Sequence, residues 1–271
     1  MAYLPRMEYL CSEHVPGRYA TLFIPSERAI QIRCDPQLGA TIKSGASRMD
    51  LRFRHLAHTN PSGSTNPSPS ARIIGLFDEN AAEWDRLRSP GSLFEKPWLD
   101  RFVSLLGPGS TILDLGCGSA QPIAAYLIRS GYAVTGVDSS PALVNLCLGR
   151  FPNNEWIVAD MRTLSLGRRF DGVLAWDSFF HLPHDDQRAM FQVFARHMQP
   201  RGVLMFTSGP AHGEVLSTFA GEPLYHASLD PNEYRQLLHE SGFQVVGHVA
   251  EDPSCGDHTI WLARYTSPRL A

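Results

Sequence analysis

Cysteine, net charge and long hydrophobic runs are all scarce in this sequence, and each scarcity excludes a class of protein. The five cysteines are scattered and odd in number, and no two have CxxC spacing, which argues against a disulfide framework and a structural metal site. The formal charge of -3 gives no general attraction to nucleic acid or to an anionic membrane. No apolar run is long enough to span a bilayer, and the first residues lack the apolar core of a signal peptide. We therefore expect a cytoplasmic protein that binds no metal, membrane or nucleic acid.

A hydrophobic fraction of 43% over 271 residues is enough for a sizeable core, but one stretch is too polar to contribute to it. Thr59–Ser70 is rich in proline and serine, as linkers are. We place the domain boundary there, so that residues 1–70 form an N-terminal extension, expected to be poorly ordered, and residues 71–271 form the folded domain. The apolar pieces Tyr19–Ile24 and Ala29–Ile32 leave a small accessory unit of strands as the alternative.

The middle of the sequence holds a strand pattern that runs directly into two glycines and a helix pattern. Thr111–Leu115 is an apolar run of strand-forming residues, which Gly116 and Gly118 interrupt. Pro122–Ile128 then continues with helical spacing. Because glycine lacks a Cβ, such a turn lets the backbone approach a ligand closely. The pattern predicts a nucleotide-like ligand over the carboxyl end of the first strand of a parallel sheet.

Two residues distinguish this turn from the glycine turns that bind dinucleotides. The dinucleotide fingerprint has a third small residue, which lets helix and strand pack closely, and Gln121 stands at that position here. Asp114 adds a carboxylate two residues before the first glycine, where it would repel a diphosphate. Both residues favour a cationic or amine-bearing ligand over a nicotinamide dinucleotide.

Strand and helix patterns alternate along the chain, which predicts a parallel sheet with crossover helices. The predicted strands are 111–115, 132–138, 156–160, 170–177, 203–207, 243–249 and 259–265, and the predicted helices are 76–87, 97–106, 122–128, one from 141, 185–197 and 230–241. Asp78, Ser139 or Ser140, and Asp230 are the predicted N-caps of three of these helices. The last two strands have no helix between them, so we expect them to pair antiparallel.

Two further strand ends complete a set of motifs. The second strand ends in Gly136–Asp138 and the third in Val158–Met161, so each carries a carboxylate at its tip. Together with Asp114 and the glycine turn, this set resembles the class I S-adenosylmethionine-dependent methyltransferase family over about residues 98–265. The resemblance implies an α/β, Rossmann-like fold: a seven-stranded, mostly parallel sheet with helices on both faces and a C-terminal antiparallel hairpin.

The resemblance also implies roles for residues at the strand ends. Asp114 would contact the amino group of the methionine moiety, Asp138 the two ribose hydroxyls and Asp160 the adenine amino group. Met161 would offer a backbone N–H and a soft side chain to the adenine ring. The predicted residues for binding S-adenosylmethionine are Asp114, Gly116, Cys117, Gly118, Asp138, Ser139, Asp160, Met161, Trp176 and Asp177. Ala120 departs from the family, in which glycine is frequent at this position, and we expect its methyl group to be tolerated.

Methyl transfer from a sulfonium is an in-line displacement, so a protein has to align the acceptor, exclude water and, where needed, remove a proton. A histidine on a loop at the carboxyl edge of the sheet titrates near neutral pH and can serve as the base, although most loop histidines are hydrogen-bond partners or solvent-exposed. The predicted catalytic residues are His181, which follows the fourth strand, then Asp177, His226 and His258. No metal site is predicted, because the loop histidines lack a tight spacing such as HxxxH.

The loop after the fourth strand indicates the class of acceptor. Methyltransferases that act on DNA amino groups carry an Asn/Asp-Pro-Pro-aromatic motif there, whereas Asp177–Phe180 contains no proline. The Pro-Cys nucleophile of C5-cytosine enzymes is absent as well. Trp176, Tyr225 and the Phe179-Phe180 pair, with the tryptophans of the leading helices, predict a closed aromatic pocket for a small molecule.

We therefore predict a monomeric or homodimeric methyltransferase acting on a small-molecule nucleophile. Two alternatives remain open at this point. A non-catalytic scaffold or regulator that binds S-adenosylmethionine would keep the same three carboxylates, which favour binding but not turnover. A nicotinamide-dependent oxidoreductase shares the early strand–glycine–helix pattern, although Gln121, Asp114 and the terminal hairpin argue against it.

Overall fold

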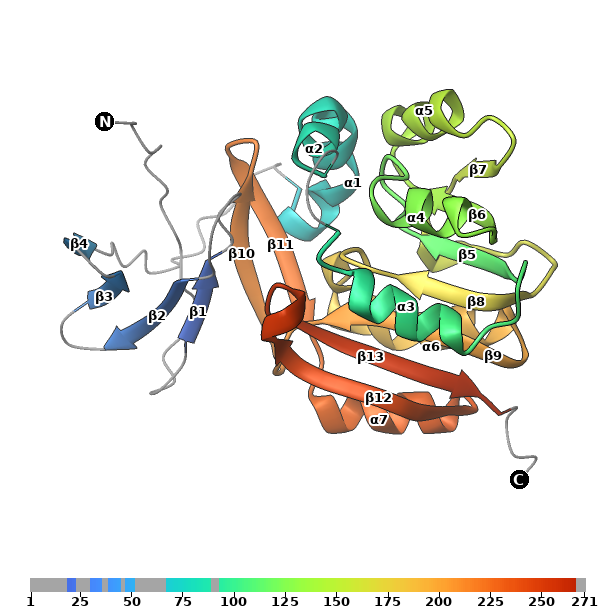
Figure 1. The fold of residues 1–271 in the computed structure, drawn as a ribbon. Coiled ribbons are helices and arrows are strands. Elements are labelled where there is room, and N and C mark those ends of the chain that lie inside the picture. The colour runs from blue at the N-terminus through green and yellow to red at the C-terminus, as the bar shows by residue number, and fades with distance from the viewer. Residues whose placement is uncertain are drawn as a thin grey trace. The chain divides into compact units, whose positions relative to one another are not determined.

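One mixed sheet of seven strands positions the rest of the folded domain in this computed structural model (Figure 1). Its strands are β5 (Thr111–Leu115), β6 (Ala133–Asp138), β7 (Glu155–Val158), β8 (Phe170–Ala175), β9 (Met198–Ser208), β12 (Phe243–Asp252) and β13 (His258–Tyr265). They lie in the order β12-β13-β9-β8-β5-β6-β7. The pairs from β7 to β9 are parallel, and β13 pairs antiparallel with both β9 and β12. The predicted Rossmann-like sheet with a C-terminal antiparallel hairpin is confirmed.

Helices cover both faces of this sheet. The helices of the structure are α1 (Pro69–Glu79), α2 (Ala81–Arg88), α3 (Lys96–Ser104), α4 (Ile123–Arg129), α5 (Pro141–Arg150), α6 (His184–Arg196) and α7 (Pro231–Glu240), with short 3-10 turns η1 (Met161–Thr163), η2 (Phe179–His181) and η3 (Pro253–Cys255). Residues of α3, α4 and α5 share one buried cluster with the sheet, and residues of α6 and α7 share the other. No helix in the described part of the chain is long and apolar enough to cross a membrane.

The structure describes residues 67–88 and 93–266 in full, and before them only the backbone of four strands. These are β1 (Tyr19–Leu22), β2 (Ile30–Asp35), β3 (Gly39–Ser44) and β4 (Ser47–Leu51), which form an antiparallel sheet in that order. Contacts divide the chain into one unit of residues 1–67 and 215–224 and another of residues 68–214 and 225–271. Most of the predicted linker lies outside the described residues, but its last two residues, Pro69 and Ser70, begin α1. The domain division and the state of residues 1–70 stay predictions.

Helix starts follow the predicted caps with one exception. Ser140 Oγ accepts a hydrogen bond from Leu143 N at the start of α5, and Asp230 caps α7 in the same way. Asp78, the predicted cap of the first helix, instead lies near the end of α1, and its Oδ1 accepts bonds from Ser140 Oγ at 2.7 Å and Ala142 N at 2.9 Å. The cap prediction was therefore wrong, because this carboxylate supports the start of another helix that lies far along the chain.

A hairpin that the sequence did not predict follows β9. It consists of β10 (Gly213–Phe219) and β11 (Glu222–Ser228), which form a two-stranded sheet. Both turn residues, Ala220 and Gly221, have positive φ, at 52° and 83°, which is typical of the tight turns that connect paired strands. An Ala-Gly turn is a weaker signal than Asn-Gly, because alanine is rarely found in this conformation.

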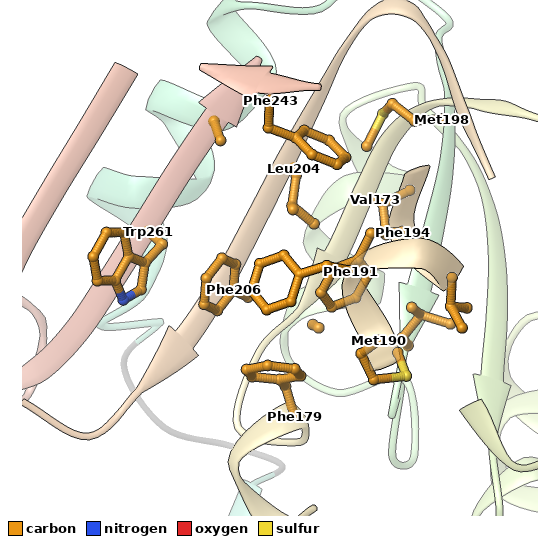
Figure 2. Close-up of a cluster of buried hydrophobic side chains, with 14 of the residues drawn as sticks. Val173, Phe179, Met190, Phe191, Phe194, Met198, Leu204, Phe206, Phe243 and Trp261 are labelled. Atoms are coloured by element: carbon orange, nitrogen blue, oxygen red, sulfur yellow. The ribbon is translucent and has the colours of Figure 1, made fainter. Parts of the chain in front are cut away.

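The larger buried cluster lies on the α6–α7 side of the sheet (Figure 2). Phe206 of β9 is at its centre, with its ring centroid 5.2 Å from that of Phe179 and 5.9 Å from that of Trp261. Phe179 is fully buried within this cluster. The prediction that Phe179 lines a substrate pocket was therefore wrong, because its side chain turns under η2 into the core.

Candidate functional site

A cavity opens at the carboxyl end of the parallel strands, beneath α1. It is lined by Ser70, Ala71, Ile73, Ile74, Phe77, Trp84, Gly116, Gly118, Val137, Asp138, Ser139, Leu143, Ala159, Asp160, Met161, Arg162, Asp177, Ser178, His181, Leu182 and Pro183. Open parallel sheets bind ligands at this edge. Most of the predicted cofactor residues lie here, whereas Asp114, Cys117 and Trp176 do not line the cavity.

The glycine loop needs both of its glycines. Gly116 and Gly118 have φ values of 75° and 55°, a conformation that disfavours residues with a Cβ. A Cβ on Gly116 would lie 2.2 Å from Cβ of Ser178, and one on Gly118 would lie 3.1 Å from Nε1 of Trp84. The missing side chains therefore leave room for the loop after β8 and for α2 at the mouth of the cavity.

Asp138, at the tip of β6, is tied to the glycine loop. Its Oδ2 accepts a hydrogen bond from Gly118 N and its Oδ1 one from Ser140 N, both at 2.9 Å. Burial raises the pKa of this carboxyl to about 6, although these backbone N–H groups favour the charged form. Because a carboxylate has about four acceptor positions and three backbone N–H groups, those of Gly118, Ser139 and Ser140, bond this one, it keeps capacity for a donor in the cavity.

Asp160, at the start of η1, is held by its neighbour Arg162. The Arg162 guanidinium bonds both oxygens of Asp160, with the shortest contact 2.6 Å from Nη2 to Oδ2, and also reaches Asp186 at 3.0 Å. Burial raises the pKa of Asp160, but the bonds from Arg162 outweigh it and hold the pKa below its ordinary value. Sequence reasoning missed Arg162, which also lines the cavity and whose only sequence signal is its place directly after Met161.

Asp177, just past the end of β8, forms a partly buried ion pair with His258 from β13. Its Oδ1 lies 2.9 Å from His258 Nε2. Burial raises the pKa of Asp177, but the charge and hydrogen bond of His258 lower it to about 2. Conversely, burial lowers the pKa of His258, and Asp177 raises it to about 8. Asp177 also has a φ of 48° and donates its N–H to Thr207 Oγ1, so the surrounding structure fixes it in a left-handed conformation.

Two further predicted histidines lie beside each other. His181 of η2 lines the cavity, and its Nδ1 is 2.8 Å from the backbone oxygen of Tyr225. The ring centroid of His226 lies 4.8 Å from that of His181, but His226 does not line the cavity. Burial lowers the pKa of both rings, that of His226 to about 3. The structure thus gathers His181, His226, His258 and Asp177 in one region.

The three predicted cofactor residues outside the cavity lining are all buried. Asp114 lies within β5, where burial and the charge of Asp138 raise the pKa of its carboxyl to about 7. The Cys117 side chain belongs to the buried cluster on the α3–α5 side of the sheet. Trp176 stacks on the His258 ring at 5.5 Å. Trp176 therefore packs against the histidine of the Asp177–His258 ion pair.

Two carboxylates hold α1 and α2 over the glycine loop. The sequence did not predict this role for either of them. Besides Asp78, which supports α5, Asp85 of α2 accepts two 2.6 Å bonds from Arg150 and one of 2.6 Å from Ser119 Oγ. These contacts keep Phe77 and Trp84, whose ring centroids are 5.1 Å apart, at the cavity. In the described residues, no group of three His, Cys, Asp or Glu side chains is placed to hold a metal ion.

Comparison with known proteins points to one family. Residues 112–202 match the profile of a methyltransferase domain family. Trans-aconitate 2-methyltransferase from Azoarcus sp. (strain BH72) is 33% identical over 100 residues, which are 36% of this chain and 39% of that protein. O-methyltransferase rstn1 from Aspergillus nomiae is 26% identical over 152 residues, which are 51% of this chain and 66% of that protein. The chain thus spans less than two thirds of the length of these relatives.

A solved structure extends the likeness of fold to most of the chain. The 1,6-didemethyltoxoflavin-N1-methyltransferase of Burkholderia thailandensis, solved with 1,6-didemethyltoxoflavin and S-adenosylhomocysteine, matches with a TM-score of 0.60. The match covers 91% of this chain and 99% of that one at 18% sequence identity. At this identity the match shows a shared fold.

Proposed function

Because the chain carries a methyltransferase domain of the class I S-adenosylmethionine-dependent family, we propose that it transfers a methyl group from S-adenosylmethionine to a small-molecule acceptor. Bound S-adenosylmethionine supplies a methyl group on a sulfonium, which an acceptor takes by in-line displacement. The glycine loop suits such a ligand, because two side chains are absent where its backbone borders the cavity.

One observation carries this proposal: Asp138 lines the cavity while bonded to the glycine loop. Its carboxylate accepts hydrogen bonds from backbone N–H groups that include those of Gly118 and Ser140, and it keeps acceptor capacity for a ribose hydroxyl in the cavity. The proposed binding site of the sugar is therefore the part of the cavity beside Asp138 and Gly118.

Residues at the ends of other strands suit the other parts of the same ligand. Asp160 and Met161 would hold the adenine, with Arg162 fixing the Asp160 carboxylate. Asp177 would lie on the side of the sulfonium, where an ionised carboxylate favours the positive charge. Asp114 is too deeply buried to line the cavity, so its proposed effect on the amine of the ligand is through the loop or a bridging water.

A small molecule is the proposed acceptor. The cavity is enclosed by Phe77, Trp84 and His181 rather than by a basic surface, and the formal charge of the chain is -3. The named acceptors of the relatives, trans-aconitate and 1,6-didemethyltoxoflavin, are small molecules as well.

Titration calorimetry with S-adenosylmethionine, S-adenosylhomocysteine and NAD tests the proposal. We expect both sulfur nucleosides to bind and NAD to bind far more weakly. Replacing Asp138 with Asn should weaken the binding of S-adenosylhomocysteine roughly 10- to 100-fold, because hydrogen bonds to a charged group contribute about that much to affinity. Asp100→Asn is the matched control, because Asp100 is an exposed carboxylate on α3 paired with Lys96. Preferential binding of NAD, or equal affinity in both variants, would refute the proposal.

A further inference from the structure

The three histidines near Asp177 differ in what their ring nitrogens face. His258 Nδ1 lies 2.9 Å from the backbone oxygen of Cys255 and 3.1 Å from that of Gly256, and its Nε2 faces the Asp177 carboxylate. Carbonyl and carboxylate oxygens only accept hydrogen bonds, so this ring donates from both nitrogens. It is therefore an imidazolium, in agreement with its raised pKa of about 8, and has no lone pair with which to remove a proton.

His181 has the opposite character. In the described part of the chain the only hydrogen bond of its ring joins Nδ1 to the backbone oxygen of Tyr225, at 2.8 Å. Because that oxygen is an acceptor, Nδ1 carries the hydrogen. The ring is buried and its pKa is lowered, so it is neutral near pH 7 and its Nε2 holds a lone pair. Since the ring lines the cavity, Nε2 is the basic nitrogen offered to a ligand there.

Groups from several elements surround the His181 ring and favour its neutral form. Phe77 of α1 and Phe180 of η2 cover the ring at centroid distances of 5.3 and 4.8 Å. His226 of β11, at 4.8 Å, has its pKa lowered to about 3 by burial and is neutral. Asp177 is the nearby negative charge and favours a proton on His181 once one arrives. Asp160 and Arg162 also line the cavity, and because they form an ion pair their charges offset each other.

We propose that His181 is the general base of this site, and that the acceptor is a neutral molecule whose nucleophilic oxygen or nitrogen carries a proton, such as a phenol or a heteroaromatic N–H. This inference rests on the proposed methyl transfer. The O–H or N–H bond of the acceptor breaks, its electron pair stays on the nucleophilic atom, and the proton bonds to Nε2 of His181. The resulting imidazolium is stabilised by Asp177 and later loses the proton to water. An ionised carboxylate acceptor would have no proton for this base to remove.

Nitrogen-detected NMR on histidine-labelled protein tests the assignment without any substrate. At about pH 7 we expect His181 to show the neutral form with hydrogen on Nδ1, and His258 to show two protonated nitrogens. The His181→Gln and His258→Gln variants identify the two sets of signals. A charged His181 at this pH, or a neutral His181 with hydrogen on Nε2, would overturn the proposal.

Kinetics with a panel of phenols, heteroaromatic N–H compounds and carboxylic acids tests the acceptor class. We expect methylation of the first two classes, a fall in kcat of about 100-fold or more in His181→Gln, and loss of the acidic limb of the pH profile. Affinity for S-adenosylhomocysteine should change little, so this failure is distinct from a failure of cofactor binding. His239→Gln, an exposed histidine at the end of α7, is the control. A preference for carboxylic acids, or an unchanged pH profile in His181→Gln, would contradict the proposal.

Discussion

The pKa values of two aspartates, one at the end of β6 and one just past the end of β8, are shifted in opposite directions by their surroundings. Asp138 accepts hydrogen bonds from backbone N–H groups, but burial outweighs them and its pKa rises to about 6. Asp177 faces the His258 imidazolium instead, so its pKa falls to about 2. The site therefore holds one carboxylate whose affinity for hydroxyl donors depends on pH near neutrality and one that stays ionised.

The Asp177–His258 pair predicts a specific pH dependence of stability. The pKa of His258 is raised from 6.5 to about 8, so its contribution is complete below pH 6.5 and is lost as the pH rises through 8. The shift corresponds to about 2 kcal/mol of unfolding free energy. Urea unfolding at about pH 6 and about pH 9 should show this loss in the wild type and in His239→Gln, but not in His258→Gln. The same loss in His258→Gln would mean that the pair does not contribute.

For single residues, the sequence predicts where a side chain lies in the fold better than which side chain it pairs with. The carboxylates at the ends of strands were identified because alternating strand and helix patterns place strand ends at one edge. The pairing of Asp177 with His258 was not, because the two residues are far apart in the chain and only the antiparallel return of β13 brings them together. The same applies to Phe179, whose side-chain direction depends on the conformation of η2.

Helices α1 and α2 owe their place over the cavity to polar contacts with the start and end of α5. Asp78 bonds Ser140 Oγ and Ala142 N at the first turn of α5, and the bond to Ala142 N is the main cause of its lowered pKa. Asp85 forms an ion pair with Arg150 at the last turn of α5. Since α1 contributes Ser70 and Phe77 to the cavity, the fastening of these helices determines how well the site is enclosed.

Releasing one of these fastenings should loosen α1. In Asp78→Ala we expect the amides of α1 and of the first turn of α5 to exchange hydrogen severalfold faster, because a lost cap costs about 1 kcal/mol. Hydrogen exchange followed by mass spectrometry measures this. Glu79→Ala is the control, because the adjacent Glu79 is exposed and lies 3.8 Å from Arg72 in a surface ion pair. Equal exchange in both variants would show that Asp78 does not fasten α1.

Element types were largely predictable, whereas several element ends were not. Helical spacing and caps such as Ser140 and Asp230 predicted the helices from α3 to α7 to within a few residues. The first helix starts earlier than predicted, at Pro69, because Ser68 caps it within a stretch whose composition is typical of a linker. The β10–β11 hairpin escaped prediction because the Ala-Gly pair that connects its strands is a weak turn signal.

The folded domain depends on two hydrophobic clusters, one on each face of the sheet. The cluster on the α6–α7 side is the more aromatic, and Figure 2 shows Phe206 between Phe179, Phe191 and Trp261. Because the strand that carries Phe206 adjoins β8, packing in this cluster also fixes the strand end that carries Asp177.

Truncation of this side chain should be costly for the whole domain. We expect Phe206→Ala to lower the unfolding free energy by roughly 3–5 kcal/mol, because a fully buried aromatic ring is replaced by a cavity. Leu148→Ala on α5 should cost far less, since Leu148 is 45% exposed. Equilibrium urea unfolding compares the two variants. A similar small cost for both would mean that the Phe206 cluster is not the main core.

Deleting residues 1–66 should leave cofactor affinity nearly unchanged. Every residue that lines the cavity lies at or beyond Ser70, and the deletion retains Ser68, which caps α1. Calorimetry with S-adenosylhomocysteine on the full chain and the shortened chain measures this. A large loss of affinity would assign the N-terminal extension a part in the site.

A crystal structure with S-adenosylhomocysteine bound would test the central claim most directly. We expect the ribose hydroxyls within hydrogen-bond distance of both oxygens of Asp138, the adenine beside Met161, and the sulfur on the side of Asp177 and His181. A nucleoside bound away from the glycine loop, or an Asp138 carboxylate with no contact to the sugar, would contradict the account.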